Sequence, residues 1–161
     1  MMNEQTVRLD RMRYTKNTTS SRLAILAIVF DVFYFVSIYK TNVDFYYNIL
    51  MGASILYNLI FMLAAFLASE GVKNYKQGFS YVLCVMGIIQ IARIFILPAK
   101  AHATTVTVGA TEMLAMSDGQ FVRVAFYLVA SAVCLFAAAV VNLNKSRALS
   151  AHIAGLEGQK A

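Results

Sequence analysis

The sequence predicts an all-α integral membrane protein whose core is a four-helix transmembrane bundle. The 161-residue chain is 60% hydrophobic and only 14% charged, and its mean hydropathy is +0.64. Soluble domains average about 45–50% apolar and about 25% charged residues, so the chain departs from both values in the same direction. A single proline fits long uninterrupted helices. This composition excludes a disordered chain, a disulfide scaffold and an ordinary soluble enzyme.

Four segments are long and apolar enough to cross the hydrocarbon core of a bilayer, which takes about 20 mostly apolar residues. The predicted spans cover residues 23–39, 45–68, 79–97 and 121–143. We therefore divide the chain into a basic cytoplasmic N-terminal segment (1–21), a four-span transmembrane domain (22–144) and a cytoplasmic tail (145–161). The tail is expected to be helical, because apolar residues recur there at helical spacing.

Polar and small residues near the ends of the spans predict where the helices begin and end. Ser20 and Ser21 can cap the first helix. Ser117 and Gln120 form a capping box before the fourth helix. Gly71 stands where a left-handed C-cap glycine would end the second helix.

The loop over residues 99–120 is the only substantial connection between spans. Thr105 to Val108 alternates threonine with valine, which predicts a short strand. We expect residues 111–116 to form one helical turn.

The distribution of basic residues predicts that both termini lie in the cytoplasm. Ten of them lie in the N-terminal segment, the loop after the second span and the tail: Arg8, Arg11, Arg13, Lys16, Arg22, Lys73, Lys76, Lys145, Arg147 and Lys160. The other two loops hold only Lys40 and Lys100. Cytoplasmic loops carry an excess of Lys and Arg. This asymmetry also explains the net charge of +6 without a nucleic acid partner.

Five polar residues inside the spans are the candidate functional residues, because lipid cannot satisfy buried polar groups. They are Asp31, Asn58, Gln90, Arg93 and Arg123. The helix rise places Asp31 near the middle of the membrane and Arg93 above it. Gln90 and Arg93 share one helix face. Because side chains tilt toward the helix N-terminus, Arg93 is expected to lean toward Asp31.

This intramembrane polar cluster allows two interpretations. It could form a site for an ion, a proton or a polar ligand. Alternatively, its members satisfy one another, or a partner subunit, and hold the helices in register. We favour the second interpretation, because an isolated charged pair without a repeated motif is more often structural than part of a transport pathway. Arg93 and Arg123 can also reach the outer membrane boundary by snorkelling.

Small residues recur at four-residue spacing along the fourth span, at Ala130, Cys134 and Ala138. Small residues let helix backbones approach closely in lipid. This helix-packing seam could pack within the four-helix unit or against another chain, and the sequence favours neither.

The sequence holds no motif for catalysis or for binding a metal or cofactor. It lacks the glycine patterns of nucleotide-binding loops, the serine nucleophile elbow and the paired histidines of zinc proteases. Cys84 and Cys134 form no C-x-x-C pair. Neither His102 nor His152 lies in a span, which argues against a haem. We therefore expect no enzyme activity, no cofactor and no metal ion.

The favoured function is an accessory or assembly subunit of a larger membrane complex, with a transporter as the favoured complex. The small size, short loops, packing seam and helical tail support it, and it predicts other membrane-protein subunits as partners beside the lipid bilayer. The alternative is a self-sufficient transporter or channel, assembled from copies of this chain around Asp31 and Arg93. The composition fits a multi-pass protein of the bacterial cytoplasmic membrane.

Overall fold

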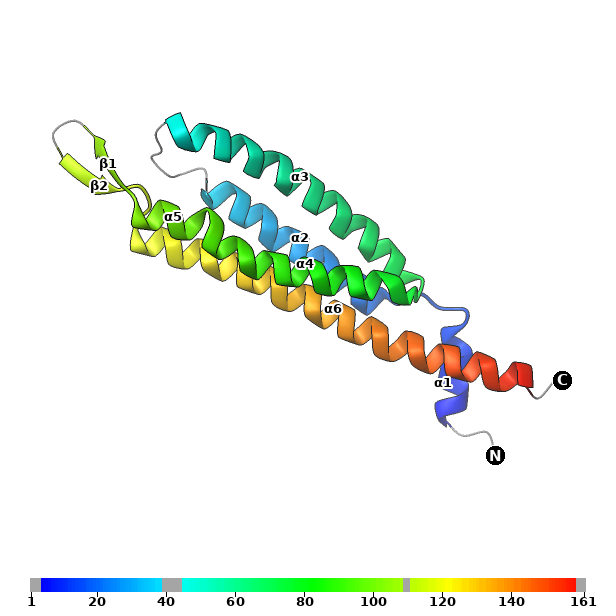
Figure 1. Ribbon diagram of the computed structural model, residues 1–161. Helices are drawn as coiled ribbons and strands as arrows, with labels where there is room; N and C mark the ends of the chain where they lie inside the picture. Colours follow the sequence, from blue (N-terminus) through cyan, green and yellow to red (C-terminus); the bar gives the residue numbers. More distant parts are fainter. Residues whose placement is uncertain (1–3, 39–44, 109–110, 159–161) are drawn as a thin grey trace.

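A computed structural model shows four long helices packed side by side, with a short hairpin at one end and both termini at the other (Figure 1). It describes residues 4–38, 45–108 and 111–158. The elements in order are α1 (Glu4–Met12), α2 (Thr18–Ile38), α3 (Phe45–Lys73), α4 (Gln77–Ile96), α5 (Pro98–Ala103), β1 (Thr105–Val108), β2 (Thr111–Leu114) and α6 (Asp118–Gly158). We call the two ends of the bundle the hairpin end and the terminal end.

The four long helices, α2, α3, α4 and α6, are each long and apolar enough to span a membrane. The chain is therefore a multi-pass membrane protein whose apolar helices contact lipid. The predicted spans agree with these helices, although α3 and α6 extend several residues further. Residue 39, the first predicted outer loop and residues 159–161 lie outside the described residues.

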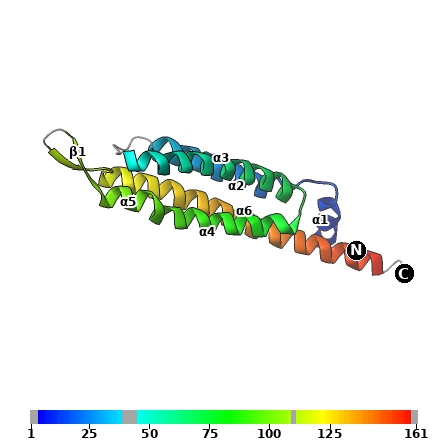
Figure 2. The same cartoon turned by 45° about the horizontal axis from the view of Figure 1, so that its top comes forward.

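The helices form two layers, α2 with α3 and α4 with α6 (Figure 2). The inward faces combine small and polar side chains with a few large apolar ones, while most of the large aliphatic side chains are exposed on the outside. On α2 the buried positions alternate four-residue and three-residue steps: Ser20, Ala24, Ala27, Asp31, Tyr34 and Ile38. This spacing is that of left-handed helix bundles. In lipid, close packing of small residues replaces the hydrophobic effect as the force between helices.

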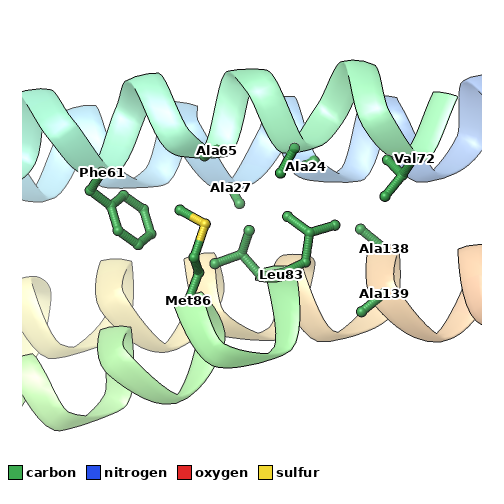
Figure 3. Close-up of a cluster of buried hydrophobic side chains, with 11 residues drawn as sticks. Ala24, Ala27, Phe61, Ala65, Val72, Leu83, Met86, Ala138 and Ala139 are labelled. Carbon is green, nitrogen blue, oxygen red and sulfur yellow. The ribbon is translucent and has the colours of Figure 1, made fainter. Parts of the chain in front are cut away.

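The most extensive contact between helices is that of α2 with α6, and alanine allows a close approach there. Ala24, Ala27, Ala138 and Ala139 are fully buried in one apolar cluster toward the terminal end, which Figure 3 shows. The Ser131 hydroxyl donates a hydrogen bond to the Ala27 carbonyl oxygen at 3.0 Å. The two backbones are therefore near enough for a side chain of one to bond the main chain of the other.

The predicted packing seam lies largely inside the bundle. Ala138 is fully buried, Cys134 packs against the same apolar cluster and Ala130 is half-buried. Within the described residues, the seam therefore contributes to packing in a single chain.

The turn between α3 and α4 differs from the prediction made for Gly71. The helix α3 continues through Gly71 to Lys73, and the left-handed residue of the turn is Tyr75, with φ of 56°. A Cβ atom on Gly71 would lie 2.2 Å from the Phe79 ring. Gly71 is therefore required for the close approach of α3 to α4, rather than for a helix cap.

The connection at the hairpin end is a two-stranded sheet. The expected strand is present as β1, but the expected helical turn over residues 111–116 is wrong, because β2 pairs antiparallel with β1. Thr105 lies opposite Leu114 and Val108 lies opposite Thr111. Strand pairing satisfies the backbone groups that a single helical turn would leave open.

The predicted helix caps are partly corrected. The Asn17 side chain accepts a hydrogen bond from the Ser20 amide at 3.5 Å, so α2 begins one turn earlier than expected. Ser117 caps α6 by accepting from the Gln120 amide at 3.3 Å. The Gln120 side chain does not close the capping box; it donates to the Ser37 carbonyl oxygen at 2.9 Å and ties α6 to α2.

Candidate functional site

The structure brings four of the five predicted polar residues into one layer of the bundle. Asp31 lies on α2, Asn58 on α3, and Gln90 and Arg93 on α4. Ser131 adds a hydroxyl from α6, so every long helix contributes a polar group. All five side chains are buried, and Arg93 keeps 6% of its surface exposed. We call these five residues the central polar layer.

Arg93 is the centre of this layer. Its Nη1 atom donates to Asp31 Oδ1 at 2.9 Å and to Gln90 Oε1 at 2.7 Å. Its Nη2 atom donates to Asn58 Oδ1. A guanidinium has five N–H donors, and these contacts use three of them. The backward lean expected from the helix geometry places the charged group beside Asp31.

A second set of contacts joins the layer to α6. Gln90 Nε2 donates to Asp31 Oδ1 at 2.9 Å and to Ser131 Oγ at 3.1 Å. Ser131 in turn donates to the main chain of α2. A chain of hydrogen bonds therefore runs from Asn58 on α3 through Arg93 and Gln90 to α6 and α2. Such networks stabilise a bundle in lipid because no other partners are available there.

Aromatic rings surround the guanidinium group. The Arg93 Cζ atom lies 4.5 Å from the Tyr34 ring centroid, 4.6 Å from that of Tyr57 and 5.9 Å from that of Phe61. Aromatic faces attract cations, and the attraction grows when water is excluded. The rings therefore partly replace the hydration that Arg93 would have in water.

The layer is electrically balanced but not fully hydrogen-bonded. Asp31 and Arg93 supply one charge of each sign. Within the described part of the chain, Asp31 Oδ2 and Asn58 Nδ2 are buried and make no hydrogen bond. Asp31 Oδ2 could accept a further hydrogen bond, and Asn58 Nδ2 could donate one. The layer therefore retains a small capacity for a polar ligand.

A cavity of about 250 Å³ reaches Arg93 from the hairpin end. Its walls come from α2, α3, α4 and α5: Tyr34, Ala53, Ser54, Tyr57, Ile89, Arg93, Ile96, Leu97 and Lys100. Toward the terminal end the bundle interior is filled by the apolar cluster of Figure 3, with Phe61, Leu83 and Met86 among its members. The cavity thus ends at Arg93, above packed apolar side chains.

The structure does not bring Arg123 into the central polar layer. Arg123 is exposed on α6, whereas Val124 beside it is fully buried. The inward face of α6 is set by Val124, Leu128 and Ser131, so the preceding position points outward. Arg123 stands within the first two turns of α6, consistent with snorkelling to the membrane boundary.

Sequence reasoning missed Tyr34, Tyr57 and Ser131. Tyr34 could have been found from the spacing of Ala24, Ala27 and Asp31, because the inward stripe of α2 continues to it. The spans contain several other tyrosines and serines. Only the rotation of each helix about its own axis decides that Tyr57 and Ser131 face the central polar layer.

A second polar layer, also missed, lies at the terminal end. Asn17 Nδ2 donates to Ser20 Oγ at 2.8 Å and to Asn142 Oδ1 at 3.0 Å. Asn142 Nδ2 donates to Ser80 Oγ at 2.7 Å and to the Lys76 carbonyl oxygen at 3.2 Å. This layer joins the start of α2, the start of α4 and the middle of α6. Asn142 lies in the last turn of the predicted fourth span. An asparagine there is equally compatible with a buried position and with the membrane interface, so the sequence does not identify it.

Comparison of the chain with models of protein families, with curated proteins and with solved structures finds no match. Among the described residues, no group of three or more His, Cys, Asp or Glu side chains is placed to hold a metal ion. The function is therefore inferred from the geometry of this chain alone.

Proposed function

We propose that this chain is an accessory or assembly subunit of a larger membrane complex, with a transporter as the favoured complex. The observation that supports it most directly is the extension of α6 beyond the bundle. The helix has 41 residues, so it is about 60 Å long, twice the roughly 30 Å of a hydrocarbon core. Its last turns project from the terminal end and offer a rigid surface for a partner (Figure 1).

The projecting part of α6 is held in place by α1. His152 Nε2 lies 2.8 Å from Asp10 Oδ1, which joins the two helices near the C-terminus. We call α1 together with residues 145–158 of α6 the arm. Leu149 and Ile153 remain only half-buried on it. Such a projecting and partly apolar element is suited to docking against another subunit.

The central polar layer supports the same proposal. Its hydrogen bonds connect all four long helices, and its two charges neutralise each other. The cavity above it does not continue through the apolar cluster below. These features favour a structural role for the layer in holding the bundle together.

We infer the orientation from charge. Both termini lie at one end of the bundle, and nine of the basic residues that the structure describes lie near that end (Figure 1). The positive-inside rule assigns this end to the cytoplasm. We propose that the chain lies in the bacterial cytoplasmic membrane.

Co-purification tests the accessory role. The chain, tagged at its C-terminus, is extracted from native membranes in mild detergent, and its bound proteins are identified after size exclusion. We expect a stoichiometric set of membrane subunits, which Leu149→Gln with Ile153→Gln on the arm should release. Ala154→Gln, an exposed change on the same helix, is the matched control. A peak that contains only this chain would contradict the proposal.

The alternative proposal is a homo-oligomeric transporter or channel. It is supported by the cavity that reaches Arg93 and by the open hydrogen-bonding capacity of Asp31 Oδ2. It predicts that Asp31→Asn abolishes proton, K⁺ or Cl⁻ flux in proteoliposomes while insertion and oligomer size are unchanged. Equal flux in wild type and Asp31→Asn would exclude it.

A further inference from the structure

A basic hollow of about 280 Å³ lies at the terminal end, where the helix ends of the bundle meet. It is lined by Arg8 and Arg11 of α1, by Met12, Thr15 and Lys16 near the α1–α2 connection, by Tyr75 of the α3–α4 turn and by Lys145 of α6. Four cationic side chains therefore surround one space: Arg8, Arg11, Lys16 and Lys145. We call this hollow the basic cradle.

Two carboxylates near the terminal end are already engaged. Asp10 contacts His152, and Glu70 pairs with Lys73 at 2.7 Å. Among the described residues, none of the four cradle cations forms an ion pair. Four like charges around one hollow repel each other, so an anion placed among them lowers the electrostatic energy of the folded state.

Two cradle residues are held in position. Lys145 Nζ donates at 3.1 Å to Asn17 Oδ1, and Asn17 is itself fixed in the buried polar layer with Asn142. Tyr75 has a left-handed backbone, with φ of 56°, which is uncommon for a bulky residue. Such conformations persist only where the surrounding structure enforces them. The enforced backbone at Tyr75 fixes where its side chain leaves the main chain, and this residue lines the hollow.

The surroundings of the cradle fit a membrane lipid. An adjoining hollow of about 350 Å³ shares Arg8, Met12 and Lys145 with the cradle and adds Leu9, Asn144 and Ala148. Tyr14 is 85% exposed beside Arg13, as is typical of aromatic residues at a membrane interface.

The depth of the cradle also fits a headgroup. Lys16 lies two residues before α2, and Lys145 lies two residues beyond the last predicted span. Both side chains therefore lie at the level where the apolar helices leave the hydrocarbon core.

We propose that the basic cradle binds the phosphate group of an anionic phospholipid from the leaflet at the terminal end. Arginine side chains bind phosphate oxygens bidentately, and Lys16 and Lys145 add point charges. The glycerol and the first acyl carbons would lie against Leu9, Met12 and Ala148. Basic pockets beside membrane-spanning helices bind anionic headgroups in this way.

Native mass spectrometry of the full chain tests this proposal, with phosphatidylglycerol and phosphatidylcholine as the two probes. Arg8→Gln with Arg11→Gln removes two exposed cradle cations. Arg22→Gln with Arg147→Gln, both exposed, removes the same charge elsewhere. We expect retained phosphatidylglycerol to fall at least tenfold in the first variant and to stay unchanged in the second. Phosphatidylcholine should not be retained.

Lys145→Gln is the second test variant, and it too should lower phosphatidylglycerol retention. Circular dichroism in zwitterionic detergent verifies that each variant stays folded. Equal loss of lipid in the Arg22 and Arg147 control variant would overturn the proposal, because it would show general charge attraction. So would wild-type protein that retains no phosphatidylglycerol. Displacement of the lipid by millimolar glycerol 3-phosphate would also overturn it, because the ligand would then be a soluble phosphate ester.

Discussion

Arg93 places a guanidinium group in the interior of the bundle, where the side chain is almost fully buried. Three contributions compensate: the carboxylate of Asp31, two amide oxygens and the faces of two tyrosine rings. Removing one member of a buried charged pair is costly because the other charge remains without its partner. The pair is therefore best examined by changing both residues.

A double-mutant cycle measures the coupling of Asp31 and Arg93. Arg93→Leu should lower the free energy of unfolding by roughly 3–5 kcal/mol, the range for breaking buried pairs in soluble proteins. Adding Asp31→Leu should restore part of that loss, because no isolated charge remains. Thermal unfolding in detergent, followed by circular dichroism, gives the four values. Strictly additive single changes would show that the two residues are not coupled.

Asn142 is expected to contribute more to the stability of the bundle than its position near the membrane boundary indicates. Asn142→Leu removes the bonds that Asn142 makes to Asn17 Nδ2, Ser80 Oγ and the Lys76 carbonyl oxygen, although Asn17 Nδ2 keeps its bond to Ser20. A buried polar group left without a partner costs about 1–3 kcal/mol. Asn144→Leu is the matched control, because Asn144 is exposed on the same helix. In thermal unfolding, the Asn142→Leu variant should melt at a lower temperature than the Asn144→Leu variant. Equal melting temperatures would contradict a structural role for the second polar layer.

At the scale of the elements, the bundle depends on how closely its helices approach. The contact of α2 with α6 is made by alanines and by one serine that bonds the opposite main chain. The contact of α3 with α4 near their turn is made by a glycine against a phenylalanine ring. In both cases the important property of the residue is its small volume.

Two glycines near the α3–α4 turn should respond to alanine in opposite directions. At Gly71 the new methyl group would meet the Phe79 ring, so Gly71→Ala should destabilise by about 1–3 kcal/mol. At Gly78 a Cβ atom meets nothing within 4 Å, so Gly78→Ala should stabilise α4 by up to about 1 kcal/mol. Differential scanning fluorimetry can compare the two. The same shift in melting temperature for both would show that close packing at Gly71 is unimportant.

At the scale of the whole molecule, the arrangement of the spans predicts their sidedness. In a chain whose Cys84 and Cys134 are replaced by alanine, Glu112→Cys places a thiol on the hairpin and Ser150→Cys places one on the arm. A membrane-impermeant maleimide should label the hairpin thiol in intact cells and the arm thiol only after permeabilisation. The reverse pattern would contradict cytoplasmic termini.

The sequence predicts the spans and the neighbours of Asp31 well, for a simple reason. Apolar runs are a property of the chain itself, and the helix rise converts residue number into depth. Depth places Gln90 near the level of Asp31 and Arg93 above both, and the tilt of side chains toward the helix N-terminus brings Arg93 toward Asp31. It leaves open how each helix is rotated about its own axis. For that reason the sequence groups Arg123, which is exposed on α6, with the buried polar residues, and it gives no signal for Tyr57. The end of an apolar run also differs from the end of a helix, as Gly71 shows.

The length of α6 has a consequence for how the chain tolerates insertions. Because the helix is continuous from the hairpin end to the arm, the azimuth of the arm around the bundle axis is fixed by a count of residues. One residue inserted between Asn142 and His152 would turn everything beyond it by about 100° and break the Asp10 contact. A loop would absorb such a change locally. In a continuous helix, any change in the number of residues also changes the direction in which the following residues face, so the two cannot vary independently.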